Sequence, residues 1–334
     1  MKKYSLYLLA ISVGICLLLG EVGFEKKHEN FNEMLEAKNL MIKLSREIYS
    51  EKVNRAINID KKLDILESGL IGEEFTGITT TLGDLDSKRL STNPEFAAYF
   101  VKELKNKGLK KDDVVYVNMS SSFPGLNLSL ISALDTLGLR GVIINSIGSS
   151  MYGANNEKFI FLEMTNFLKS KDMIKNSVEL YTLGGDADEG LNFDEDIKEQ
   201  LVERLKNIDI PKLDFKNLND NIGKRIAYYG KYPNPKYFIN IGGNLVSSKL
   251  EKYYESLEVP TLTMLNIKQI ALANGISNAK NSKQLYENSQ NLIFYFGIIF
   301  VFYIYIFTSI ELKSCFNVKK VLLYIEKHTQ GDKK

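Results

Sequence analysis

Several groups of side chains in this sequence have the types and spacing to do chemistry. One is a run of hydroxyls, Ser120-Ser121-Ser122, followed by Phe123-Pro124-Gly125. Hydroxyls and free main-chain N–H groups at the start of a helix suit an anion such as a phosphate or a carboxylate. The same run allows two other interpretations, in which a serine caps the helix or acts as a nucleophile. The sequence therefore predicts a helix start here, with ligand binding as one of its uses.

A nucleophilic serine needs a base. The chain has two histidines, His28 and His328, and both lie outside the region that carries the serine-rich loops, so a Ser-His-Asp triad is disfavoured. The G-x-S-x-G nucleophile motif is also absent from the sequence. A Ser-Lys pair is left open, with Lys88, Lys224 or Lys249 as the base, and the spacing does not choose between them.

A second group is acidic and follows two glycines, in the order Gly184-Gly185-Asp186-Ala187-Asp188-Glu189. Carboxylates this close in sequence could hold Mg²⁺ or Ca²⁺, with Asp186 and Asp188 as the candidate ligands. The loop is not an EF-hand, because Ile197 stands where the bidentate Glu is required. The alternative is an acidic loop that leads into a helix. We expect no cofactor other than such a divalent cation.

Composition excludes several functions. The net charge of +2 gives no general attraction to nucleic acid, so no nucleic-acid partner is expected. The two cysteines, Cys16 and Cys315, cannot build a disulfide framework or a metal site. The phosphate-binding motifs G-x-x-x-x-G-K-[ST] and G-x-G-x-x-G are both absent, which disfavours a kinase, an ATP-dependent ligase or an NAD dehydrogenase. The basic pairs Lys88-Arg89 and Lys224-Arg225 either contact a polyanion or are solvated surface.

The elements that must position these groups alternate between strand and helix. Strands are predicted at 114–119, 141–145, 178–183 and 237–241, each ending in small flexible residues, and a last one at 259–265. Alternation of this kind predicts an open, mostly parallel, Rossmann-like sheet with helices on both faces. Ligands of such sheets bind beyond the carboxyl ends of the strands, so the loops named above are the expected binding loops.

Helices are predicted between these strands, at 94–107, 124–137, 156–170, 194–207, 247–256 and 268–274. Segment 71–93 is rich in Thr and Gly and is interpreted as a loop or edge strand near the ligand. Segment 211–235 is interpreted as a connection with some short helix.

Two uncharged segments, Tyr4–Gly20 and Leu292–Ile310, predict a membrane protein. Alternatives are a cleaved signal peptide for the first and a buried helix for the second. The expected organisation is a transmembrane signal anchor, a helical stalk, an extracytoplasmic α/β domain, a linker, a transmembrane helix and a basic tail, at 1–20, 21–69, 70–275, 276–291, 292–310 and 311–334. Lysines in the tail place both termini of this two-pass protein in the cytoplasm.

A set of segments resembles a known family. These segments are Gly77–Leu85 with Lys88-Arg89, Asn93–Ala97, Ser120–Asn127, Ser146–Asn155 and Leu183–Gly185. Together they are similar to the poly-γ-glutamate system protein family. The resemblance implies a membrane-anchored partner of the bacterial machinery that makes and exports this surface or capsule polymer, with the synthase and export subunits as partners. It carries over no catalytic residues.

The sequence thus predicts an accessory protein of poly-γ-glutamate biosynthesis or export that binds an anionic polymer or a small anionic ligand. The alternative is an extracytoplasmic hydrolase or transferase that acts on γ-glutamyl or other anionic substrates through the serine-rich loops. The candidate ligand-binding residues are Thr80, Thr81, Lys88, Arg89, Ser120, Ser121, Ser122, Ser149, Ser150, Tyr152, Asn155, Gly184, Gly185, Gly242 and Gly243.

Overall fold

The computed structural model describes residues 7, 11, 14, 25–277, 283–288 and 292–329. The chain divides into two compact units, which are treated separately: His28–Leu285, and Met1–Lys27 together with Tyr286–Lys334. The first of these units carries the candidate functional loops.

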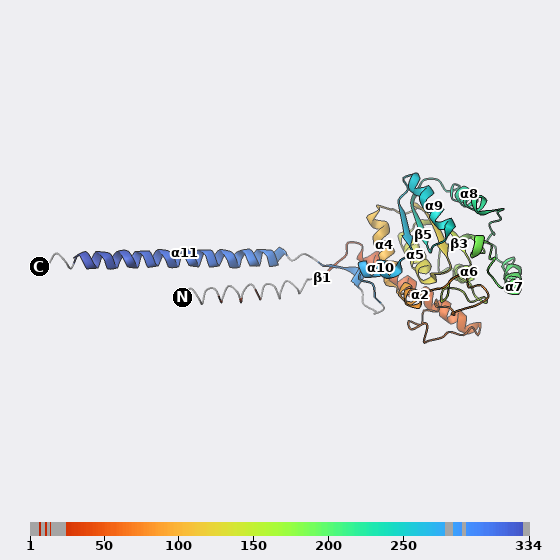
Figure 1. The fold of residues 1–334 in the computed structure, drawn as a ribbon, viewed down its shortest axis with the longest axis horizontal. Coiled ribbons are helices and arrows are strands. Elements are labelled where there is room, and N and C mark those ends of the chain that lie inside the picture. Colours follow the sequence, from red (N-terminus) through yellow and green to blue (C-terminus); the bar gives the residue numbers. More distant parts are fainter. Residues whose placement is uncertain are drawn as a thin grey trace. The chain divides into compact units, whose positions relative to one another are not determined.

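A parallel five-stranded sheet forms the centre of the His28–Leu285 unit (Figure 1). Its strands are β2 (Val114–Ser120), β3 (Arg140–Ser146), β4 (Val178–Thr182), β5 (Pro235–Ile241) and β6 (Thr261–Met264). They lie in the order β4-β3-β2-β5-β6, and every neighbouring pair is parallel. The prediction of a parallel α/β fold is confirmed.

Helices cover both faces of this sheet, as predicted. One face packs against α2 (Phe31–Asn54), α4 (Glu95–Asn106), α5 (Pro124–Leu137) and α6 (Phe161–Ser170). The other face packs against α8 (Leu218–Tyr229) and α9 (Leu245–Ser256), which lie above the sheet in Figure 1. Burial on both faces explains why the central strands are almost continuously apolar.

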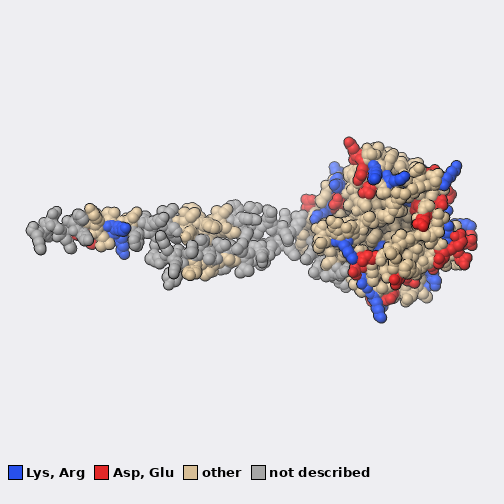
Figure 2. Space-filling view, in the orientation of Figure 1, with Lys and Arg blue, Asp and Glu red and all other residues tan. Residues whose placement is uncertain are grey.

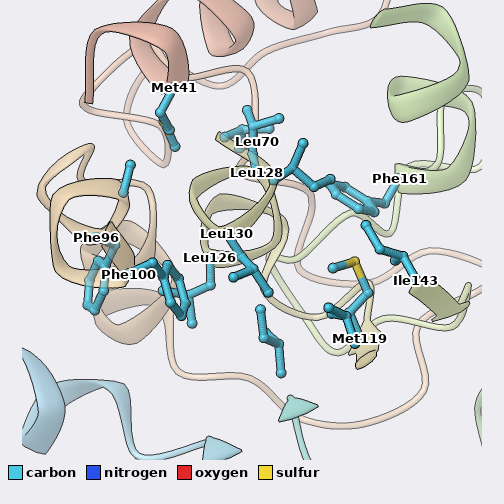
Figure 3. Packing of buried hydrophobic residues seen from close by; sticks show 14 of the residues in the cluster. Met41, Leu70, Phe96, Phe100, Met119, Leu126, Leu128, Leu130, Ile143 and Phe161 are labelled. Atoms are coloured by element: carbon cyan, nitrogen blue, oxygen red, sulfur yellow. The ribbon is translucent and has the colours of Figure 1, made fainter. Parts of the chain in front are cut away.

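Alternate residues of β2 serve the two cores. Val115, Val117 and Met119 join the larger core, whereas Tyr116 joins the smaller one. Figure 3 shows Met119 and Ile143 of the sheet beneath the leucines of α5, with Phe96 and Phe100 of α4 beside them. Helix α5 ends at Gly138, whose φ of 63° is the left-handed conformation that glycine adopts most easily.

Helix α2 is not a stalk. Met34, Ala37, Met41, Leu44 and Ile48 are fully buried, and the helix contacts α4 and α5. The apolar spacing that suggested a helix was the spacing of a core-facing stripe. The prediction of a separate stalk at 21–69 was wrong because an amphipathic helix stabilises itself by burying that stripe against a neighbour.

The remaining bounds differ from the predictions at a few places. Segment 71–93, expected to be a loop or edge strand, contains the helix α3 (Leu85–Ser91), which begins where the Asp84 carboxylate accepts a hydrogen bond from the Ser87 N–H. The connection at 211–235 holds a full helix, α8. Short elements complete the unit: the helices α7 (Glu195–Leu205) and α10 (Ile267–Ala273), and the 3₁₀ turns η1 (Asp186–Asp188) and η2 (Lys283–Leu285).

The other unit contains β1 (Glu25–Lys27), which pairs antiparallel with β7 (Tyr286–Asn288), and the helix α11 (Leu292–Thr329). The predicted anchor at 1–20 lies outside the described residues except for residues 7, 11 and 14. Within the described part of the chain, no helix is long and apolar enough to cross a membrane. The predicted flanking membrane helices therefore gain no support from the structure.

Candidate functional site

The sheet has one topological switch point, between β2 and β5. The chain runs from β2 outward through β3 to β4, then returns to the other side of β2 with β5 and β6. The helices that follow β2 and β5 therefore pack on opposite faces of the sheet, α5 on one and α9 on the other. Where two neighbouring strands diverge in this way, their loops leave a crevice that commonly holds the ligand.

Two loops follow the strands at this switch point. The end of β2 and the loop after it contribute Ser120, Ser122 and Phe123, which are all half-buried. The loop after β5 contributes Gly242, Gly243 and Asn244. We call these six residues the β2–β5 rim. Gly242 approaches the side chain of Ser120 so closely that an added Cβ would lie 2.8 Å from the Ser120 Cβ. The two loops are thus in direct contact.

The serines of the β2 loop differ in what they can do. Ser121 is fully buried, and its hydroxyl donates to the Ser146 carbonyl at 3.1 Å. Ser120 donates its hydroxyl hydrogen bond to Ser122 at 2.9 Å. The Ser122 hydroxyl accepts that bond and a second one from the Ser150 N–H at 3.0 Å. Ser120 and Ser122 face the rim, whereas Ser121 is structural.

The start of α5 is not an open anion site. An added Cβ at Gly125 would lie 2.4 Å from the Ser91 carbonyl oxygen, so the end of α3 is packed directly against the first turn of α5. A ligand was expected at this helix N-terminus, but there is no room for one. The α9 N-terminus differs, because Gly243, Asn244 and Leu245 are exposed there.

The loop after β3 is paired with the segment that precedes α3. The Thr80 N–H donates to the Ser149 carbonyl at 2.8 Å, and the Met151 N–H donates to the Thr81 carbonyl at 3.0 Å. Asn155 is fully buried and holds the same segment through both the N–H and the carbonyl of Glu73. These contacts give Thr80, Thr81 and Asn155 a role in fixing the loop.

Two further residues of the β3 loop were expected to bind ligand. Ser149 is fully buried, and its hydroxyl donates to main-chain carbonyls, including that of Ser121. Tyr152 is half-buried and has a φ of 61°, and burial followed by the nearby Glu74 raises the pKa of its phenol. Ser150 is the member of this loop whose hydroxyl meets a charged residue.

Lys88 lies in the middle of these loops. Its ammonium donates to the Ser122 carbonyl and, at 2.7 Å, to the Ser150 hydroxyl, and it lies 3.7 Å from the centre of the Phe123 ring. The residue is 2% exposed. Burial lowers the pKa of Lys88 to about 7, and the field of Asp84 only partly opposes this shift. Lys88 is therefore partly uncharged at neutral pH.

The other basic residues that the sequence singled out lie elsewhere. Arg89 donates to the carbonyls of Leu63 and Lys62 and fixes that distant segment. Lys224 donates to the Asp214 carbonyl and pairs with Asp220, while Lys249 donates to Asn219. Of the three candidate bases, Lys88 is the one that contacts a serine hydroxyl at the strand ends.

Gly184 and Gly185 close the β4 side of the site. An added Cβ at Gly184 would lie 2.6 Å from the Gly148 nitrogen, and Gly184 has a φ of 77°. An added Cβ at Gly185 would lie 2.1 Å from the Asn192 side-chain oxygen. These glycines let main chains approach closely, and they do not leave space for a ligand.

Asp188 is buried in an ion pair that the sequence analysis missed. Its Oδ2 lies 2.7 Å from Arg225 Nη2, and both side chains are almost completely buried. Its Oδ1 accepts hydrogen bonds from Ser146 and Thr182 at 2.9 Å each. The carboxylate is fully occupied by these donors.

Arg225 also donates to Asn118 Oδ1 at 2.6 Å and to Asn221 Oδ1 at 2.9 Å. This network joins β2, β3, β4 and α8 beneath the rim. Its sequence signal was the polar Asn118 inside an apolar strand, together with an arginine in a segment interpreted as a connection.

The predicted divalent cation at Asp186 and Asp188 receives no geometric support. Asp186 is exposed, and Asp188 faces the Arg225 guanidinium. Among the residues with described positions, no three His, Cys, Asp or Glu side chains are grouped closely enough to hold a metal ion.

Surface charge is uneven along the carboxyl edge of the sheet. Acidic side chains gather on the side of the molecule where Figure 1 places α7 (Figure 2). The exposed acids of that helix and its cap are Asp194, Glu195, Asp196, Glu199 and Glu203. These carboxylates repel an anionic ligand from the β4 end of the sheet. Two cavities of about 620 Å³ lie elsewhere, one at Lys107–Lys110 and one beside α2 and Glu95.

No protein-family model matches this chain, and no curated protein matches it in sequence.

Proposed function

We propose that this protein is a membrane-anchored accessory component of bacterial poly-γ-glutamate biosynthesis or export, which binds the anionic polymer at the β2–β5 rim. The observation that carries the proposal is the convergence of four of the segments on which the resemblance rests. The segments Gly77–Leu85, Ser120–Asn127, Ser146–Asn155 and Leu183–Gly185 contact one another at the carboxyl edge of the sheet. Segments that are distant in sequence but meet at one edge are the expected arrangement of a binding site.

The rim offers suitable groups for repeated carboxylates. Ser120 and Ser122 present hydroxyls, and the start of α9 presents main-chain N–H groups beside the exposed Gly243 and Asn244. Partial positive charge at a helix N-terminus favours an anion. The rim lies at the surface, which suits an extended polymer that passes over it.

Membrane anchoring is part of the proposal and rests on the uncharged segments Tyr4–Gly20 and Leu292–Ile310. With a basic tail after the second segment, the α/β unit faces outside the cytoplasm. Reporter fusions to the α/β unit test this topology, and a cytoplasmic position of that unit would contradict it.

The accessory role is tested by deleting the gene while retaining the synthase, then measuring surface polymer. The proposal expects a loss of surface polymer that the wild-type gene restores. Unchanged polymer in the deletion strain would refute the role in this process.

Binding at the rim is tested with the matched pair Gly243→Asp and Gly243→Asn in the full-length protein. A side chain at Gly243 meets only the flexible end of Leu265, so both variants are expected to fold. One carboxylate about 4 Å from a ligand carboxylate costs about 1 kcal/mol in water and about 4 kcal/mol at a partly buried site. Titration with γ-linked glutamate oligomers should show at least about fivefold weaker binding for Asp than for Asn, and less difference at high salt. Equal affinities would place the polymer elsewhere.

A further inference from the structure

The contact between Lys88 and Ser150 has the geometry of a nucleophile and its base. We propose that Ser150, Lys88 and Ser122 form an acyl-transfer site, in which the Ser150 hydroxyl attacks the carbonyl carbon of a carboxylic ester or amide. This activity goes beyond a binding role, and its test does not depend on that role.

Ser150 is set apart from its neighbours by its hydrogen bonding. The hydroxyls of Ser120, Ser121 and Ser149 all donate to protein oxygens. Among the described residues, the Ser150 hydroxyl has one polar partner, the Lys88 amine at 2.7 Å. When Lys88 is uncharged, this hydrogen bond reverses and the Ser150 O–H donates to the amine lone pair.

The surroundings of Lys88 favour the uncharged amine. The side chain is 2% exposed, and its charged end meets a carbonyl, a hydroxyl and the Phe123 ring. The charged group whose field reaches it is Asp84, which is exposed and pairs with Lys268 at 2.8 Å. A desolvated lysine without a buried carboxylate partner is a base that works near neutral pH.

Ser122 is positioned to polarise the substrate. Its oxygen accepts hydrogen bonds from the Ser120 hydroxyl and from the Ser150 N–H, so it lies beside the nucleophilic residue. Its own proton has no acceptor within the part of the chain that the structure describes. Because Ser122 is half-buried at the rim, that O–H can donate to a substrate carbonyl oxygen as negative charge develops there.

The reaction needs no reagent other than the acyl substrate and water. The Ser150 oxygen bonds to the acyl carbon while its proton passes to Lys88 Nζ. The bond from the acyl carbon to the leaving oxygen or nitrogen then breaks, and the leaving group takes the proton from the Lys88 ammonium. The product is a Ser150 ester. Water then attacks the acyl carbon and gives a proton to Lys88. As the bond from the acyl carbon to the Ser150 oxygen breaks, that oxygen takes the proton from the Lys88 ammonium, which releases the carboxylic acid and restores both side chains.

The probe for this site is p-nitrophenyl acetate, used on the full-length protein in detergent micelles at pH values below and above 7. Nitrophenolate release gives the acylation rate, and peptide mapping by mass spectrometry locates the acetyl group. The expected result is one acetyl group on Ser150, at a rate that rises with pH around a midpoint near the Lys88 pKa of about 7. Ser150→Ala should abolish this acylation, and Lys88→Met should slow it at least about 100-fold. Ser122→Ala should slow it about 10²-fold or more, as for loss of one oxyanion donor.

Matched controls are Lys224→Met and Ser170→Ala, which alter an exposed lysine and an exposed serine outside the site. Both should acylate Ser150 as the wild type does. Folding of every variant is checked by circular dichroism, and the pH profile of the wild type decides the matter if Lys88→Met does not fold. An acetyl group on Lys88 or on another serine would overturn the proposal. So would a Ser150 acylation rate that is independent of pH or unchanged in folded Lys88→Met.

Discussion

The buried Asp188–Arg225 ion pair gives a sharp test of how this fold is held together. The perturbation is Asp188→Asn, which keeps the shape of the side chain and removes its charge. The residue has a φ of 66°, a conformation that asparagine tolerates, so the main chain adds little to the effect. The substitution replaces one carboxylate oxygen with an amide nitrogen, which cannot accept hydrogen bonds as the Asp188 oxygens do from Arg225 and Asn221.

The magnitude follows from the isolation of Arg225. Its guanidinium is completely buried, and Asp188 is the carboxylate that pairs with it in the described residues. Breaking a buried pair from one side costs about 3–5 kcal/mol, because a charge is left uncompensated. A chain of this size loses roughly 2–4 °C in Tm for each kcal/mol, so Tm should fall by about 6–20 °C.

Thermal and urea unfolding of the full-length protein, followed by far-ultraviolet circular dichroism, measure this loss. The matched control is Asp186→Asn in the same loop, which removes an exposed carboxylate and should stay within about 0.5 kcal/mol of wild type. The double variant Asp188→Asn with Arg225→Met should lose less than the sum of the single variants, since it leaves no buried charge. A loss below about 1 kcal/mol in Asp188→Asn would refute the reasoning.

Two further predictions concern α2 and the titration of Lys88. Met41→Ala should lower the free energy of unfolding by about 2–5 kcal/mol, whereas Val53→Ala on the exposed face of α2 should lower it little. Equally small losses for both variants in urea unfolding would show that α2 is not part of the core. Because the pKa of Lys88 falls from 10.5 to about 7 on folding, the unfolded chain binds more protons between these values, and this residue's contribution to stability rises with pH through that window. The stability of Lys88→Met relative to wild type should therefore be greatest below pH 7 and decline toward pH 10, and a flat difference across this range would contradict the buried, uncharged amine.

Much of the fold could be read from local patterns. The strands at 114–119 and 141–145 were placed to within a residue or so, because apolar runs that end in Ser and Gly are local signals. The helix at 124–137 was placed at its observed bounds, Pro124–Leu137, since proline starts it and Gly138 ends it. The order of the strands along the chain does not give their order within the sheet, so the β2–β5 switch point was not predicted.

The candidate site was predicted less completely, for a physical reason. Ser120, Ser121 and Ser122 are equivalent in sequence, yet the turn at the end of β2 buries the hydroxyl of Ser121 and leaves those of its neighbours at the rim. From the sequence alone, each of Lys88, Lys224 and Lys249 was an equally good candidate for the base. Burial separates them, since only desolvation by residues distant in sequence makes one lysine lose its proton near neutral pH.

The sequence by itself determined the parallel α/β class, the loops that follow each strand, and the absence of a histidine to serve a serine at those loops. These are properties of single segments, set by periodicity and residue type. Tertiary structure alone decided that Asp188 meets a guanidinium, that α2 belongs to the core, and that Lys88 reaches Ser150. Each of these depends on which segments pack together, and packing sets the burial that fixes the charge and the reactivity of a side chain.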